Sequence, residues 1–382
     1  MWIIDRYLLR QFIQVFVICF CSLDGLYVVF DAFSNLDEFL HFTEKQGNLL
    51  GTMFWFYVYR SIYFFERMSN MLTMIAGMFT VTWIQRHNEL TALMAAGVSR
   101  KRVIMPIVAA SALVSLTTAA GRELVIPRIS RELEKDPKNL TGENGESIKP
   151  RFDDATNILL NGVQSFGDER RIYKPSFRLP DPMLRFGRQL VADNAFYQEA
   201  RGGREGGYLL KGVSRSAEIG RQPSFVLDGK RVIITPRDEP TWLEPDQCFV
   251  VSDVNFDHLT GGRGWRQFSS TSQLIQGLSN KSLALAGDFG ADVRVSIHTR
   301  IVQPFLDMTL LFLGLPLVLS GNNRNVFAAI GLCGLVSLAF MVVVMGFQYL
   351  GGIALLRPAL AAWVSLIVFV PIAVAMADRI ER

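Results

Sequence analysis

Cysteine is scarce in this sequence, which has four such residues. Cys19, Cys21 and Cys333 fall within long apolar runs, and Cys248 lies alone in the polar central part of the chain. The central part therefore has no second cysteine with which to close an internal disulfide. We expect it to be stabilised by its own apolar core.

Histidine and recognisable catalytic motifs are also lacking. The four histidines are scattered along the chain at His41, His87, His258 and His298. No Gly-x-x-x-x-Gly-Lys-Ser/Thr phosphate loop, His-Glu-x-x-His metal motif or Gly-x-Ser-x-Gly nucleophile turn occurs. We therefore expect no catalytic residue, metal or cofactor here, and any ATP-driven work must use the ATPase of another subunit.

Charged residues are few, at 19% of the chain against 50% hydrophobic residues. This balance is typical of a membrane protein. Six runs are long enough to cross a hydrocarbon core of roughly 30 Å as helices: residues 9–33, 53–85, 102–126, 301–319, 326–348 and 358–377. The first run lacks a small-residue cleavage site, so we expect it to remain as a helix.

Basic residues in the short loops predict the orientation of these spans. One side carries Arg6, Arg10, Arg86, Arg100, Lys101, Arg102, Arg324, Arg379 and Arg382. The other side carries Lys45 among acidic residues, and Arg357. Both termini are therefore predicted to be cytoplasmic, and residues 127–298 to lie outside.

The outer segment, of about 170 residues, has the size of a single domain. Its short β-type runs, separated by turn residues, predict a sandwich or open barrel. These runs are residues 207–213, 224–227, 231–235 and 248–252, whereas residues 268–281 favour a helix. The Gly-rich patch at 202–207 is interpreted as a hairpin loop, because no helix start follows it as a phosphate cradle would require.

The segment between the second and third spans, residues 86–99, predicts a short interfacial helix. Leu90, Leu93 and Met94 have helical spacing, Gly97 can supply a left-handed stop, and Ser99 can cap the next helix. Polar residues lie near its start, where they could meet a soluble partner: Arg86, Asn88 and Glu89. We call residues 86–99 the coupling segment.

Placing an ionisable side chain within a membrane span costs free energy, so its presence there indicates a functional role. Asp24 and Asp31 are seven residues apart on the first span, as are Arg60 and Arg67 on the second, so each pair shares a helix face. In antiparallel neighbours this spacing allows Asp31 to meet Arg60 and Asp24 to meet Arg67. Asp307, on the fourth span, would lie near the deeper pair. The alternative is that Asp31 and Arg60 each reach the outer interface unaided.

Longer sequence features carry a family resemblance. After the coupling segment and the third span, Glu123-Leu124-Val125-Ile126-Pro127 leads into the outer domain. Arg300 and Pro304 open the fourth span, which continues Leu313-Gly314-Leu315-Pro316-Leu317. This layout, over essentially the whole chain, resembles the LptF/LptG permeases of the lipopolysaccharide exporter. The coupling segment is the most specific part of the resemblance.

The resemblance implies a permease subunit that pairs with a second permease, either a copy of itself or a paralogue. It implies docking to a cytoplasmic ABC ATPase dimer through the coupling segment and extraction of lipopolysaccharide from the inner membrane. The lipid would pass through a periplasmic β-jellyroll to a bridge protein, with a single-span membrane protein as a further partner and no nucleic acid. The residues expected to couple to the ATPase are Arg86, Asn88, Glu89, Leu90, Leu93, Gly97 and Ser99.

For Glu89 the alternative role is to complement the positive start of the helix. The expected division of the chain is therefore helices 1–126 with the coupling helix 86–99, a β-jellyroll-like domain 127–298, and helices 299–382. The fold class is a six-helix membrane protein with an inserted all-β domain.

The first span departs from the family. Many members carry basic residues toward its outer end, whereas this chain has Asp24, Asp31, Asp37 and Glu38. Contacts to lipid phosphate would come from Arg60, Arg67 or the partner permease, and another anionic outer-membrane lipid is an alternative substrate. Two other function classes stay open: an ABC permease that transmits motion but moves no lipid, and a membrane scaffold or sensor without an ATPase.

Overall fold

The computed structural model describes residues 2–46, 48–135, 145–167, 169–201, 204–214, 216–227, 229–259, 263–279, 287–320 and 326–381. It divides into a helical unit, Met1–Leu133 with Ala291–Arg382, and a β unit, Glu134–Gly290. The domain boundaries expected after residues 126 and 298 fall within helices α6 and α12. Arg324 and the glycines 202–203, used in the sequence argument, lie outside the described residues.

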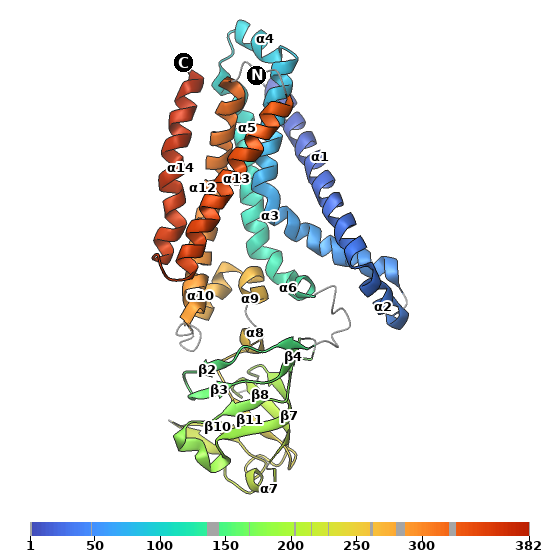
Figure 1. The fold of residues 1–382 in the computed structure, drawn as a ribbon, viewed down its shortest axis with the longest axis vertical. Helices are drawn as coiled ribbons and strands as arrows, with labels where there is room; N and C mark the ends of the chain where they lie inside the picture. Colours follow the sequence, from blue (N-terminus) through green and yellow to red (C-terminus); the bar gives the residue numbers. More distant parts are fainter. Residues whose placement is uncertain are drawn as a thin grey trace. The chain divides into compact units, whose positions relative to one another are not determined.

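Long helices dominate the helical unit (Figure 1). They are α1 (Trp2–Ser34), α2 (Leu36–Gln46), α3 (Leu49–Arg86), α4 (Glu89–Ala95), α5 (Arg100–Leu124), α6 (Ile126–Glu134), α12 (Gly287–Ser320), α13 (Val326–Gly352) and α14 (Pro358–Glu381). The six predicted apolar runs lie on α1, α3, α5, α12, α13 and α14, except that the third extends past the end of α5 at Leu124.

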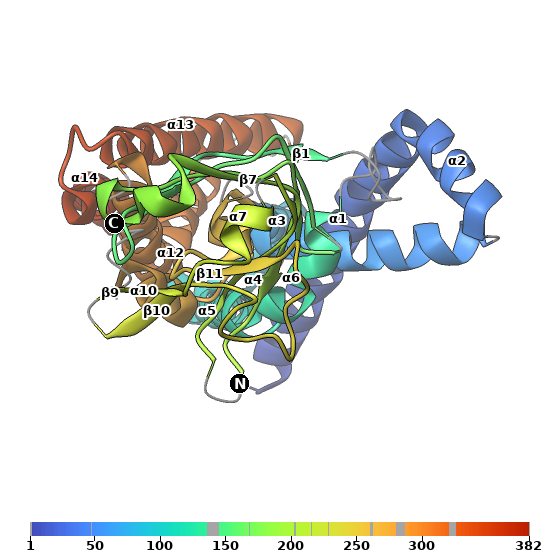
Figure 2. The same cartoon turned by 90° about the horizontal axis from the view of Figure 1, so that it is seen from below.

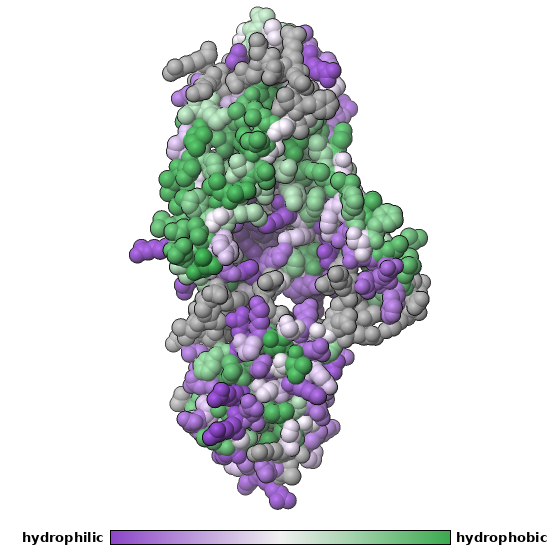
Figure 3. Space-filling view, in the orientation of Figure 1, coloured by the Kyte–Doolittle hydropathy of each residue, from purple (hydrophilic) through white to green (hydrophobic). Residues whose placement is uncertain are grey.

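Five helices among the described residues are long and apolar enough to cross a membrane. These are α1, α5, α12, α13 and α14, and α3 is outside this set. The reason is that α3 carries Arg60, Glu66 and Arg67 together with many hydroxyl and amide side chains. Hydrophobic residues cover most of the visible surface of the helical unit, as expected for helices facing lipid (Figure 3).

The core of the helical unit is formed where α3 packs against α1, α5 and α12. Leu72, Ile107 and Leu310 are fully buried there. Gly77 on α3 lies at a close approach, since a Cβ added to it would be 3.1 Å from Leu311 Cδ1 and 3.3 Å from Ile107 Cγ2. Small residues allow such close packing, which is a main source of helix association in membranes.

An arm extends away from this core. The C-terminal part of α1, the short α2 and the N-terminal part of α3 project away from α12, α13 and α14 (Figure 2). Phe39 of α2 is fully buried against the rings of Phe56 and Tyr57, at centroid distances of 5.3 and 6.0 Å. These aromatic contacts hold the arm together.

The β unit is built from short antiparallel strands. They are β1 (Glu146–Ser147), β2 (Arg151–Asp153), β3 (Ile158–Leu160), β4 (Gln164–Phe166), β5 (Arg171–Tyr173), β6 (Ser176–Arg178), β7 (Gln189–Gln198), β8 (Gly207–Val213), β9 (Phe225–Leu227), β10 (Lys230–Ile234) and β11 (Cys248–Val251). The connecting helices are η2 (Asp181–Phe186), α7 (Ser216–Ile219), α8 (Phe256–Leu259), α9 (Arg263–Phe268) and α10 (Thr271–Ser279).

The strand order is β1-β4-β5-β7-β8-β11-β10-β9, and β2, β3 and β6 join through β7. The long β7 pairs with β6 near its start and with β5 and β8 further along, so the sheet curls around it. This curled antiparallel arrangement is consistent with a jellyroll. The four predicted β runs correspond to β8, β9, β10 and β11, and α10 lies within the predicted helical stretch. The Gly-rich patch joins the paired strands β7 and β8, as a hairpin loop does.

The interior of the β unit is filled with apolar side chains. Phe177, Tyr208 and Ile233 are fully buried in it, and the Tyr208 hydroxyl donates a 2.8 Å hydrogen bond to the Val254 carbonyl. The opposite face of β8 and β11 is covered by a smaller cluster that includes Leu243. β8 is therefore buried on both faces.

Candidate functional site

The coupling segment contains the short helix α4. Asn88, which precedes the helix, is in the left-handed conformation at φ 58°, and Gly97, which follows it, has φ 81°. The Gly97 N–H bonds to the Met94 carbonyl and the Val98 N–H to the Leu93 carbonyl, both at 3.0 Å. These two bonds form a Schellman motif, in which Gly97 supplies the left-handed stop.

The apolar residues of the coupling segment fix it to the long helices. Leu90 is buried in a cluster with Leu8 of α1, Ile84 of α3 and Val103 of α5, and Leu93 packs against the edge of this cluster. One side of α4 is therefore packed against three helices. Arg86, Asn88, Gly97 and Ser99 are exposed on the remaining surface.

Glu89 contacts the first helix. The Tyr7 hydroxyl donates to both Glu89 carboxylate oxygens, at 3.1 and 3.3 Å. Glu89 is partly exposed. Position 89 is the first residue of α4, where the positive end of a helix favours a carboxylate.

Ser99 caps the next helix through its backbone and not through its side chain. Ser99 does occupy the N-cap position of α5, with extended backbone, but its side chain makes no capping hydrogen bond. Its carbonyl accepts from the Arg102 and Val103 N–H groups. Arg102 makes a 2.7 Å ion pair with Asp5, which links the starts of α5 and α1.

The acidic residues of α1 accept hydrogen bonds from hydroxyl groups of α3. The Tyr57 hydroxyl donates to Asp31 at 2.9 Å, and the Ser61 hydroxyl donates to Asp24 at 2.8 Å. The contacts of Asp31 with Arg60 and of Asp24 with Arg67 stay predictions. The Arg60 guanidinium lies over the Phe56 ring at 4.5 Å, and Arg67 is exposed.

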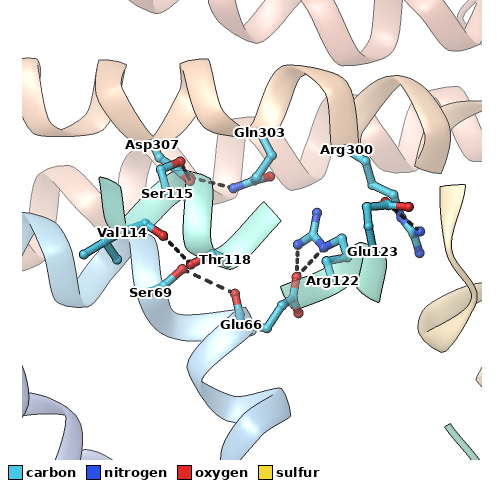
Figure 4. A network of polar contacts seen from close by, with 10 residues as sticks. All are labelled: Glu66, Ser69, Val114, Ser115, Thr118, Arg122, Glu123, Arg300, Gln303 and Asp307. Atoms are coloured by element: carbon cyan, nitrogen blue, oxygen red, sulfur yellow. Dashed lines mark hydrogen bonds and ion pairs between the residues drawn. The ribbon is translucent and has the colours of Figure 1, made fainter. Parts of the chain in front are cut away.

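Asp307 lies in a polar cluster between α5 and α12. The Ser115 hydroxyl donates to its Oδ2 and the Gln303 amide to its Oδ1, both at 2.8 Å (Figure 4). A small cavity beside it is lined by Ser69, Asn70, Thr73, Ser111, Ser115, Asp307 and Met308. Asp307 therefore joins α5 and α12 and lies beside polar residues of α3.

Next to this cluster lies a network of ion pairs. Arg122 on α5 pairs with Glu66 on α3, and Arg300 on α12 pairs with Glu123 at 3.8 Å (Figure 4). The Glu66 and Arg122 side chains are 9% and 19% exposed. The sequence argument missed Arg122 because it lies near the end of a predicted span, where arginine is common at the interface. The signal that could have found it is Glu66, a further carboxylate within the second predicted span, which requires a partner.

The β unit carries a groove of about 360 Å³ between the start of β7 and the end of β8. Phe186, Leu190, Val191, Val213 and Ile219 supply its apolar lining, and Arg188 its charge. Phe225 of β9 packs against the adjoining core, and Arg185 lies over both the Phe186 and the Phe225 rings.

Apolar helices long enough to span a bilayer, combined with a curled antiparallel β unit inserted between the third and fourth of the predicted spans, define a multi-pass membrane protein with an inserted β domain. The sequence model of the lipopolysaccharide export system permease LptF/LptG matches residues 6–168 and 260–379. The chain belongs to this family. The coupling segment and the charged residues of the long helices lie within the matched parts, whereas the groove and most of the β unit lie between them. A search of curated proteins found no match.

Proposed function

We propose that this chain extracts lipopolysaccharide from the inner membrane, as one of two permease subunits driven by a cytoplasmic ABC ATPase dimer. In this proposal α3 is a sixth span, both termini are cytoplasmic, and the periplasmic β unit passes the lipid to a bridge protein. The single observation that carries the proposal is the family match over residues 6–168 and 260–379.

The geometry of the coupling segment supports ATPase docking. Leu90 is anchored among α1, α3 and α5, while Arg86 and Asn88 are exposed beside the partly exposed Glu89. A partner that binds the exposed side can move the three helices as a unit, because interfaces of this kind transmit rigid-body shifts. We assign Glu89 the contact with a basic residue of the ATPase.

The headgroup contact is assigned to α3. Asp24 and Asp31 accept hydrogen bonds from Ser61 and Tyr57 of this helix. Arg67 is exposed, and it is the better placed of the two α3 arginines to meet an anionic lipid phosphate. Arg122 is already paired with Glu66.

A second candidate function is favoured by the filled interior of the β unit. A core with fully buried Phe177, Tyr208 and Ile233 fills the interior of the described strands, which suits a permease that transmits ATPase motion without moving lipid. Lipid transfer requires the curled sheet to open, and the groove beside Leu190 and Val213 is where acyl chains would enter.

Mass spectrometry of the purified native complex tests the proposal directly. We expect two permease chains, an ATPase dimer and copurified lipopolysaccharide. An ATPase without lipid would favour the transmission function, and neither ATPase nor lipid would favour a scaffold or sensor.

The coupling role of Glu89 is tested by Glu89→Lys. Loss of one partner of a desolvated ion pair costs about 2 to 5 kcal/mol, so ATPase copurification should fall sharply. Tyr7→Phe is the matched control, because it removes the bond within this chain and leaves the carboxylate in place. If Tyr7→Phe caused the same loss, or if Glu89→Lys assembled and exported normally, the assignment of Glu89 would be wrong.

A further inference from the structure

The cavity beside Asp307 has a lining rich in oxygen atoms. Four serine and threonine residues of α3 and α5 border it, and all are nearly fully buried: Ser69 (3% exposed), Thr73 (6%), Ser111 (1%) and Ser115 (6%). Within the described chain, the Asn70 side-chain oxygen is also buried and has no hydrogen-bond partner. An amide oxygen in this position is a vacant acceptor.

The directions of the hydroxyl groups favour a positively charged ligand. The Thr73 hydroxyl donates to the Ser69 carbonyl at 2.6 Å, and the Ser111 hydroxyl to the Ile107 carbonyl at 2.8 Å. Since each proton is used within its own helix, the oxygen lone pairs are left for another donor or a cation. Ser115 and Gln303 both donate to Asp307, as suits an ionised carboxylate.

The size of the cavity limits what can bind. It has no room for a water molecule, whereas a dehydrated Na⁺ is smaller than water. One carboxylate with several neutral oxygens matches the hard, oxygen-seeking chemistry of an alkali cation, and protein oxygens can replace its hydration shell. Among the described residues no group of three His, Cys, Asp or Glu side chains gathers as a divalent metal would require.

We propose that Asp307, Asn70 and the hydroxyl oxygens of Thr73 and Ser111 bind one dehydrated Na⁺ between α3, α5 and α12 (Figure 4 shows Asp307 and its donors). The cation balances a carboxylate within the membrane segment, where an uncompensated charge is costly. Because its ligands come from three helices, binding stabilises their packing. This inference concerns the helical unit alone and does not depend on which lipid is transported.

The test is thermal unfolding of the full complex in nanodiscs, in NaCl, KCl or N-methylglucamine chloride at one ionic strength. We expect the melting temperature to rise saturably with Na⁺, and more than with K⁺. Asp307→Asn should abolish the Na⁺ response, and Asn70→Ala should raise the half-saturating Na⁺ concentration by about tenfold or more. Thr117→Val is the matched control on α5, since this exposed hydroxyl bonds only to its own helix and lies away from the cavity.

Two results would overturn the proposal. One is an equal melting temperature in the three salts, which is expected if Asp307 is a neutral carboxylic acid. The other is a Na⁺ response that survives Asn70→Ala unchanged. If Asp307→Asn fails to assemble, Asn70→Ala and Ser111→Ala decide the question, because both leave the carboxylate and its Ser115 and Gln303 donors intact.

Discussion

At the scale of single residues, the helical unit stabilises buried charge by pairing it across helices. Arg122 and Glu66 join α5 to α3, and both side chains are mostly removed from solvent. Breaking such a pair leaves one buried charge without compensation, which costs about 3 to 5 kcal/mol. The pair therefore fixes the contact between two helices that also carry the coupling segment between them.

We expect Arg122→Gln to lower the melting temperature and the yield of the assembled complex. Adding Glu66→Gln should recover part of the loss, because the double variant leaves no orphan charge. Arg102→Gln, on the same helix, is the control: its pair with Asp5 is 44% and 35% exposed and should contribute no more than about 1 kcal/mol. Strictly additive effects of Arg122→Gln and Glu66→Gln would contradict the pairing.

A second prediction at this scale concerns His258 in the β unit. It is 5% exposed, its ring contacts that of Trp265 at 4.9 Å, and burial together with the nearby Arg151 lowers its pKa to about 4. Between pH 6.5 and pH 4 the unfolded chain binds a proton that the folded chain does not, so stability falls as the pH falls.

Hydrogen exchange in peptides spanning α8 and α9 of the full chain measures this effect. From pH 6.5 to pH 5, the free energy of opening should fall by up to about 2 kcal/mol more in the wild type than in His258→Phe, which keeps an aromatic ring. Equal changes in the two proteins would show that His258 does not titrate as described.

At the scale of elements, close contact between α3, α5 and α12 depends on a glycine. A side chain at Gly77 would meet Leu311 and Ile107, both within the core. Gly77→Leu should therefore separate the helices, at a cost of about 1 to 3 kcal/mol or more. Gly25→Leu on α1 is the control, because a Cβ there meets nothing within 4 Å. Equal melting temperatures for the two variants would contradict this packing.

The elements also show what sequence alone can predict. Hydrophobic runs and turn residues were sufficient to place the long helices, four strands and the left-handed stop at Gly97, because these depend on local composition. The hydroxyl donors to Asp24, Asp31 and Asp307 were not predictable, since helix rotation and register determine which side chains meet. The missing side-chain hydrogen bond of Ser99 shows the same limit at a helix start.

At the scale of the whole molecule, a family match spans the helical unit and leaves residues 169–259 unmatched. The sequence could predict that this central part is β-rich, but not that its core is filled by side chains such as Phe177 and Tyr208. Long-range strand pairing around β7 determines that interior, and no local pattern encodes it. Whether lipid passes through this unit is therefore the central question for the proposed function.

Photo-crosslinking in proteoliposomes answers this question most directly. A benzoylphenylalanine at Phe225, which packs against the core, is compared with one at Val226, which is 52% exposed on the opposite face of β9. The proposed transport function predicts ATP-dependent crosslinks to lipopolysaccharide at position 225, few at 226, and loss of the signal in Glu89→Lys. Equal labelling at both positions, or labelling that does not depend on ATP, would contradict lipid transfer through the β unit.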